Sequence, residues 1–298
     1  MLKRLVTGVD GWHAGRDAAV LSQALASGDD ADVLLTGVWQ ESLLPSSLLL
    51  TPNAHPLEET EEMLLAVRHD CVPRGRTRPL SGLSVARTLR RVASDEHADV
   101  LVLGASPKAS AGHVRAGRDA RQMLDASPCA VAIAARGLHA APRPVRRIVV
   151  GVDGFEESDA ALAWAAQLAR SLGATLTAVA VVDEKMPLAA DPVETGAELM
   201  QWDETVKRRR GRIEAALARA RERGDCDDVD VRVGDPGAEL TRAAVERGAD
   251  LLVIGSRRLG RDARVAVGSA AEDLLHDAPC SLVMVPRPLE HRALEAVA

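Results

Sequence analysis

Two glycines and a serine near the end of the chain have the types and spacing that could hold a phosphate group. Residues 251–270 read LLVIGSRRLGRDARVAVGSA, and the apolar run at their start ends at Gly255. Gly268 and Ser269 precede a stretch with helical spacing. Backbone N–H groups in a glycine-rich turn and at a helix N-terminus bind phosphate oxygens. Because Arg258 interrupts the segment and no Walker-type lysine is present, we interpret it as a partly preserved phosphate loop.

A carboxylate from an earlier part of the chain could complete such a site. Asp153 and Gly154 follow the apolar run RIVVGV. In open α/β sheets, ligands bind at the carboxyl ends of strands where the winding reverses, and a ribose hydroxyl or adenine amino group would donate to Asp153 there. A structural role explains the same residues, because Ser269 and Glu272 read as a capping box and Asp153 would favour the next helix N-terminus. Both interpretations remain open on these residues alone.

The elements that must position these residues occur twice. HADVLVLGAS at 97–106 matches GADLLVIGSR at 248–257, and LVTGVDGW at 5–12 matches VVGVDGF at 149–155. Two matching pairs at similar offsets indicate a duplicated domain rather than an array of short repeats.

Strand and helix patterns alternate within each copy, which is typical of βαβ units and a parallel sheet. We predict a first domain over 1–137, a linker over 138–144 and a second domain over 145–288. The second copy is longer, and its extra residues are assigned to a loop over 184–200. The strands predicted in the second copy cover 147–153, 175–183, 229–235, 250–256 and 280–286, and the helices cover 158–174, 203–224, 237–249 and 269–278.

The amino-acid composition fits a parallel α/β fold and argues against a nucleic-acid-binding protein or a membrane protein. The chain of 298 residues has no Tyr and one Phe, so its core must be built from Val, Leu, Ile and Ala, as in parallel sheets covered by helices. A net charge of −6 disfavours nucleic acid as a partner, and the basic run over 207–212 is assigned to a solvated helix face. Four cysteines without a CxxC pair and an N-terminus without an apolar signal core predict a reduced, cytoplasmic protein without a membrane span.

The motifs together resemble the universal stress protein family. They are VVGVDG, DLLVIGS, the Gly-Ser before a helix, and APCSLVMVP, and the resemblance covers nearly the whole chain as two tandem copies. It implies two doubly wound α/β domains, each a five-stranded parallel sheet in the order 3-2-1-4-5. It also implies that the two copies pair through their last strands, over 130–134 and 281–285, while dimerisation of the whole chain stays open.

The resemblance further implies ATP binding through the family pattern G-x2-G-x9-G-[S/T]. Gly255, Gly268 and Ser269 match that pattern in the second copy, whereas Arg258 replaces its middle glycine. If this position needs a positive φ, a residue other than glycine costs about 1–2 kcal/mol there. The predicted nucleotide-binding residues are Asp153, Gly154, Val181, Gly255, Ser256, Arg258, Gly260, Gly268, Ser269 and Ala270.

The first copy departs further from the pattern. Pro107 replaces the middle glycine and removes a donor N–H, and Arg118 replaces the serine, although Asp10 is retained. We therefore expect the first domain to have kept the fold and lost ATP.

The resulting functional hypothesis is a stress-response sensor or regulator that binds adenine nucleotide in its second domain. We find no nucleophile–base pair and no histidine or cysteine grouping at metal spacing, so we expect neither an enzyme nor a metal protein. The alternative is a nucleotide-independent interaction module in which both sites are vestigial.

Overall fold

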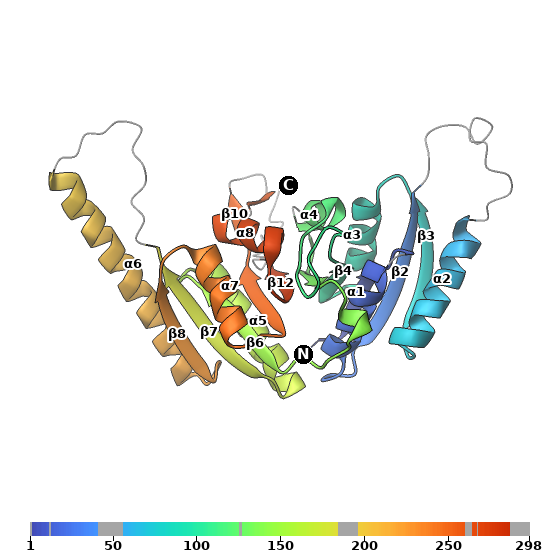
Figure 1. Ribbon diagram of the computed structural model, residues 1–298, viewed down its shortest axis with the longest axis horizontal. Coiled ribbons are helices and arrows are strands. Elements are labelled where there is room, and N and C mark those ends of the chain that lie inside the picture. Colours follow the sequence, from blue (N-terminus) through green and yellow to red (C-terminus); the bar gives the residue numbers. More distant parts are fainter. Residues whose placement is uncertain are drawn as a thin grey trace, which may run out of the picture.

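The computed structural model describes residues 2–11, 13–40, 56–124, 127–183, 196–259, 264–266 and 268–286. Strands and helices alternate along both halves of the chain (Figure 1). The first half contains β1 (Arg4–Gly8), α1 (His13–Ala26), β2 (Asp32–Gln40), α2 (Pro56–Cys71), β3 (Arg76–Gly82), α3 (Val85–Asp95), β4 (Val100–Gly104), α4 (Arg118–Leu124) and β5 (Ala130–Ala134). The second half contains β6 (Arg147–Val152), α5 (Glu156–Leu172), β7 (Thr175–Val182), α6 (Gly196–Glu222), β8 (Asp228–Val233), α7 (Pro236–Glu246), β9 (Leu251–Gly255), β10 (Arg257–Leu259), β11 (Arg264–Ala266), α8 (Ser269–Asp277) and β12 (Ser281–Val285).

Ten of these strands form one sheet in the order β3-β2-β1-β4-β5-β12-β9-β6-β7-β8. Each half of that order, numbered within its own copy, is 3-2-1-4-5, and neighbouring strands within each half are parallel. The predicted fold class is therefore confirmed. At the centre, β5 and β12 pair antiparallel, with Leu282 opposite Ile133 and Met284 opposite Val131.

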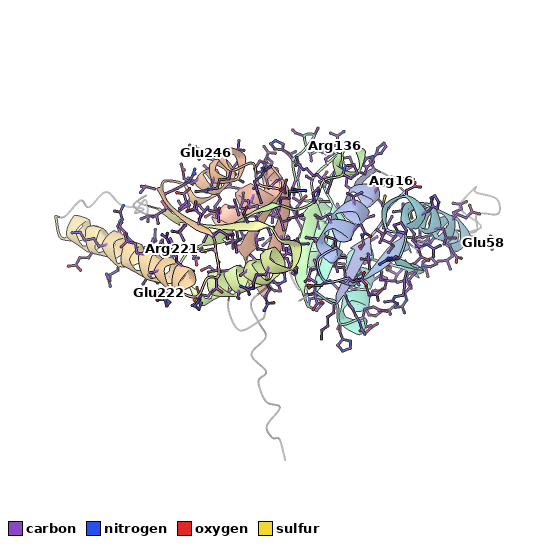
Figure 2. The ribbon with its side chains drawn as sticks, turned by 90° about the horizontal axis from the view of Figure 1, so that it is seen from below. Arg16, Glu58, Arg136, Arg221, Glu222 and Glu246 are labelled. Atoms are coloured by element: carbon purple, nitrogen blue, oxygen red, sulfur yellow. The ribbon has the colours of Figure 1, made fainter. Side chains whose placement is uncertain are left out.

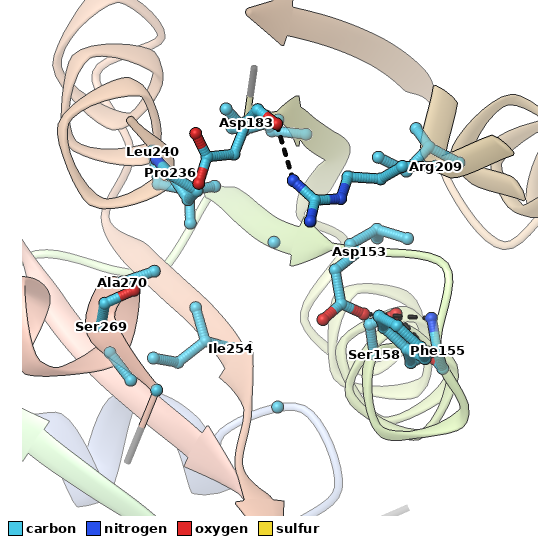
Figure 3. Close-up of a pocket in the computed structure, with 18 of the residues that line it drawn as sticks. Asp153, Phe155, Ser158, Asp183, Arg209, Pro236, Leu240, Ile254, Ser269 and Ala270 are labelled. Carbon is cyan, nitrogen blue, oxygen red and sulfur yellow. Dashed lines mark hydrogen bonds between the residues drawn. The ribbon is translucent and has the colours of Figure 1, made fainter. Parts of the chain in front are cut away.

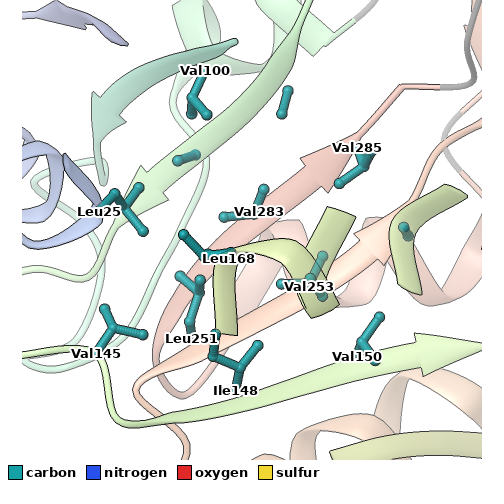
Figure 4. Packing of buried hydrophobic residues seen from close by; sticks show 14 of the residues in the cluster. Leu25, Val100, Val145, Ile148, Val150, Leu168, Leu251, Val253, Val283 and Val285 are labelled. Carbon is teal, nitrogen blue, oxygen red and sulfur yellow. The ribbon is translucent and has the colours of Figure 1, made fainter. Parts of the chain in front are cut away.

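Two apolar cores cover the two faces of the sheet, and both run through both halves. One contains residues of α1, α2, α5 and α6, and the other contains residues of α3, α4, α7 and α8. Leu25 and Val100 of the first half share a core with Leu168 and Val283 of the second (Figure 4). Charged side chains such as Arg221 and Glu222 lie at the C-terminal end of α6, the end nearer the body of the molecule, and Arg136 lies near the junction of the halves (Figure 2).

Local sequence signals place the helix ends. Asp235 caps α7 by accepting a hydrogen bond from the N–H of Ala238 (3.2 Å), and Pro236 takes the first helical position, where a missing N–H costs nothing. Gly173 ends α5 in the left-handed conformation, with φ 61°.

The start of α6 differs from the prediction. The helix begins at Gly196 and runs for 27 residues, whereas the sequence predicted a loop up to residue 200. Its first residues, GAELMQ, include several good helix formers, so the helix extends toward its N-terminus. The rest of the loop predicted over 184–200 lies outside the described residues.

The connection between the halves is held by a buried carboxylate. Asp17 of α1 is only 1% exposed and accepts hydrogen bonds from the backbone N–H groups of Gly137 (2.8 Å) and His139 (2.7 Å). Its Oδ1 atom also lies 2.6 Å from the His139 Nδ1 atom, and the His139 ring stacks on that of His13. These contacts fix the linker, including a short 3-10 turn at Leu138–Ala140, against the first domain.

No helix within the described ranges is both long enough and apolar enough to cross a membrane.

Two glycine substitutions test the contact between the halves. A Cβ atom at Gly28 would meet the backbone carbonyl of Ser171 in α5, whereas a Cβ atom at Gly211 would meet open space. We expect Gly28→Ala to lower the free energy of unfolding by about 1–3 kcal/mol, because the backbones must separate. The same change at Gly211 should raise it by about 0.5–1 kcal/mol, because alanine is the better helix former. Calorimetric melting of both variants checks this pair, and equal shifts of one sign would contradict the close packing.

The cysteines supply a second prediction. Burial raises the pKa of the Cys129 thiol to about 11 and that of the Cys280 thiol to about 12, so both stay protonated near neutral pH. Cys71 and Cys226 are only partly buried. Since the thiolate is the reacting form, we expect two fast and two slow thiols in the native chain at pH 8, and four fast ones in guanidinium. A chromogenic thiol assay measures this, and four equal native rates would contradict it.

Candidate functional site

A cavity of about 320 Å³ opens at the carboxyl ends of β6, β7 and β9 in the second domain (Figure 3). The chain leaves β6 toward β7 on one side, while β9 lies on the other side of β6, so this is where the winding of the sheet reverses. Such reversal points are the usual ligand sites of open α/β sheets.

Six of the ten predicted site residues line this one cavity, although they come from four separate segments. They are Asp153, Val181, Gly255, Gly268, Ser269 and Ala270. Gly154 lies in the turn between Asp153 and Phe155, and Ser256 is buried beside the cavity, with an Oγ atom that has no partner among the described residues. Arg258 lies in β10, and Gly260 lies outside the described residues.

The turn after β6 presents the carboxylate. Gly154 has φ +77°, in the left-handed region, and a Cβ atom there would lie 3.0 Å from the Cγ atom of Arg212. The Phe155 N–H donates to Asp153 Oδ1 (3.1 Å), which fixes the side chain as it enters the cavity. The carboxylate therefore helps to shape the start of α5, as the structural interpretation expected, and also lines the cavity.

The capping box predicted at α8 is wrong. Gly268 is the residue that caps the helix, no side chain among the described residues caps it, and Ser269 is already the first helical residue. Glu272 instead makes an ion pair with Arg121 of the first domain, at 2.6 Å. Because Gly268 precedes Ser269 with an extended backbone, the serine has moved one position too far into the helix to act as a cap. The first N–H groups of α8, at the positive end of its dipole, face the cavity, and no side chain in the described part of the chain caps them.

One wall of the cavity is formed by residues that the sequence did not predict as site residues. Arg209 and Arg212 of α6 both line the cavity, although the basic run over 207–212 was assigned to solvent. Arg209 Nη1 donates to the backbone carbonyl of Asp183 (2.6 Å), and the Arg212 guanidinium lies 3.8 Å above the Phe155 ring. Their spacing of three, next to the buried Ile213, is the signal that places them on the inner face of the helix.

The segment between Gly255 and Gly268 is a hairpin rather than a simple glycine loop. β10 and β11 pair antiparallel, with Arg258 opposite Val265. The non-glycine residues with positive φ in the described part of the chain are Asp30 and His97, so Arg258 carries no left-handed strain. Arginine is therefore compatible with this backbone, and the expected conformational cost at residue 258 does not arise.

The corresponding segment of the first domain has a different environment. Asp10 Oδ1 accepts a hydrogen bond from the N–H of Gly15 in the first turn of α1 (2.9 Å). The chain after β4 bonds to the second domain, where Val114 forms an antiparallel bridge with Ala278. This segment is thus built into the junction between the domains.

Within the described ranges, no group of three or more His, Cys, Asp or Glu side chains is arranged to hold a metal ion.

Comparison with known proteins agrees with this architecture. The model of the universal stress protein family matches residues 1–135 and 144–286. A universal stress protein of Thermus aquaticus is 28% identical over 142 residues, which cover 47% of this chain and 98% of the relative. The stress response protein NhaX of Bacillus subtilis is 30% identical over 156 residues, covering 43% of this chain and 90% of the relative.

A solved structure shows that the fold extends over both halves. A protein of unknown function from Pseudomonas aeruginosa superposes with a TM-score of 0.66 at 18% identity, covering 96% of this chain and 92% of that chain. The curated relatives each align with about half of this chain, as expected for a duplicated domain. Since the family model matches both halves, the chain belongs to the universal stress protein family and carries two copies of its domain.

Proposed function

We propose that the second domain binds an adenine nucleotide, with ATP as the ligand, and that binding regulates the protein in a stress response. The observation that carries this proposal is one cavity with a carboxylate on one wall and, on another, a helix N-terminus that no side chain of the described residues caps. These two features suit opposite ends of a nucleotide, a hydroxyl-rich end and an anionic end.

The nucleoside end is assigned to the side formed by β6 and β7. Asp153 accepts hydrogen bonds and suits the ribose hydroxyls, and the family resemblance assigns this position a contact with adenosine. Val179 and Val181 give the cavity an apolar floor on which a base can lie. The Phe155 ring is 43% exposed at the cavity and offers a flat surface beside that floor.

The phosphate end is assigned to the start of α8. Gly268, Ser269 and Ala270 line the cavity there, where backbone N–H groups and the helix dipole favour an anion. Arg209 and Arg212 add two positive charges from α6 across the cavity. The positive charges of the two arginines balance the negative charges of Asp153 and Asp183. The helix terminus therefore supplies the net attraction for phosphate.

We assign a regulatory rather than a catalytic role. The ionisable side chains that line the described part of the cavity are Asp153, Asp183, Arg209 and Arg212. No histidine or cysteine is among these lining residues, and no metal-ligating group accompanies them. Phosphoryl transfer to water requires a group that orients the attacking water. We assign Asp153 to ligand binding instead, and with it the site to regulation.

Calorimetric titration of the intact chain with ATP tests the binding. We expect one site per chain, and about ten- to a hundredfold weaker binding in Asp153→Asn, because a hydrogen bond to a charged acceptor is lost. Asparagine retains an oxygen for the Phe155 N–H, so the turn itself should persist. Gly268→Arg should abolish binding by filling the space in front of α8.

The first domain provides a matched control for Asp153→Asn. Asp10→Asn is the same change at the corresponding position. It should leave the affinity for ATP unchanged. Loss of binding in this variant alone would assign the nucleotide to the first domain, and no heat at millimolar ATP would favour the nucleotide-independent interaction module.

Turnover is tested separately. Purified protein mixed with ATP and Mg²⁺ should release inorganic phosphate no faster than Asp153→Asn or buffer alone. Rapid release by the wild-type chain that disappears in the variant would replace the regulatory role with an enzymatic one.

A further inference from the structure

The segment of the first domain that corresponds to the phosphate loop is bonded to the second domain. This segment, residues 106–117, is called the brace here. The Val114 N–H donates to the Ala278 carbonyl (2.8 Å), and the Ala278 N–H donates back to the Val114 carbonyl (3.1 Å). The Ala116 N–H donates to the Leu275 carbonyl (2.8 Å). Val114 is fully buried, so these bonds are shielded from water.

Side chains extend the same contact along α8. Arg115 Nε donates to the His276 carbonyl (3.3 Å), and its guanidinium lies 3.1 Å from the His276 ring nitrogen Nε2. His113 Nδ1 lies 2.8 Å from Asp277 Oδ1. The last carbonyls of a helix lack partners within the helix, and here the first domain supplies donors for those of α8. A cation near that end is also favourable to the helix dipole.

The brace is itself fixed to the first domain. The Ser106 N–H donates to the Arg115 carbonyl (2.8 Å), which closes the brace on itself, and the Arg136 N–H, from the chain after β5, donates to the His113 carbonyl (3.0 Å). Arg136 Nη1 donates to the Ala109 carbonyl (2.7 Å), near the junction where Figure 2 shows this arginine. The brace therefore connects α8 rigidly to the first domain through several short hydrogen bonds.

The opposite end of α8 forms the cavity. Gly268 to Ala271 line the cavity, and a helix of nine residues spans only about 14 Å. Arg121 of α4 holds Glu272, directly after this first turn, at 2.6 Å. A short helix held at its last turn and beside its first turn has little freedom to shift its N-terminal N–H groups.

We infer that the brace positions the α8 N-terminus for the ligand of the second domain, so that ligand binding and the contact between domains are energetically coupled. Arg115 and Arg121 are positioning residues in this scheme, because they act through α8. The inference rests on the proposed nucleotide site. It gives the first domain a role in that site without any ligand of its own.

Hydrogen exchange and calorimetry on the full chain test this coupling together. In the ligand-free double variant Arg115→Ala, Arg121→Ala, amides of residues 270–277 should exchange faster, and ATP should bind about three- to tenfold more weakly. Restoring Arg121 as lysine should recover part of the affinity. Arg78→Ala, which breaks the exposed Arg78–Glu96 pair elsewhere in the first domain, should change neither quantity.

Thermodynamic coupling is reciprocal, so ATP must also affect the brace, which a merely structural contact would not predict. If the brace and the ligand are coupled, ATP added to the wild-type chain must slow exchange of the brace amides by the same free energy. Unchanged affinity in the double variant, or unchanged brace exchange with ATP bound, would overturn the inference while leaving the proposed site intact. Absence of ATP binding by the wild-type chain would instead refute the proposed function, and the positioning role with it.

Discussion

The antiparallel pairing of β5 with β12 is the interaction on which the rest of the structure depends. A sheet edge exposes unpaired N–H and C=O groups, and each five-stranded half would expose one here. Their pairing joins two parallel sheets into one of ten strands and makes both apolar cores continuous across the junction. It also turns the two halves so that the loop after β4 of one faces the last helix of the other.

The two copies keep one fold and use it differently. In the second domain, the carboxyl ends of the central strands surround a cavity with charged walls. In the first domain, the segment after β4 carries Pro107 and Arg118 at the corresponding positions and bonds to α8. The segment that lines the cavity in the second domain thus has a counterpart in the first domain that helps to build the junction.

Much of the fold could be predicted from the sequence, because it depends on local patterns that occur twice. Most of the strands and helices predicted in the second copy were found to within a few residues, although α6 begins earlier than predicted and the β10–β11 hairpin was not predicted. The strand order followed from the family resemblance. Contacts between distant segments were harder to predict. Arg209 and Arg212 read as solvent-facing because their neighbours in the sequence are charged, and only the packing of α6 turns them toward the cavity. The helix cap at Gly268 and the hairpin around Arg258 are decided by backbone geometry that composition does not encode.

The hydrogen bonds that Asp17 makes to the linker have a consequence for assembly. Two separate copies of such a domain would meet through their last strands only as often as their concentration allowed. Here the connection from Gly137 onward is short and pinned, so β12 searches for β5 within a small volume, at an effective concentration in the millimolar range. Pairing is then a unimolecular event. The fraction of molecules with β5 and β12 paired is therefore the same at low and high protein concentration. Exchange of these strands between two molecules must compete with pairing inside each chain.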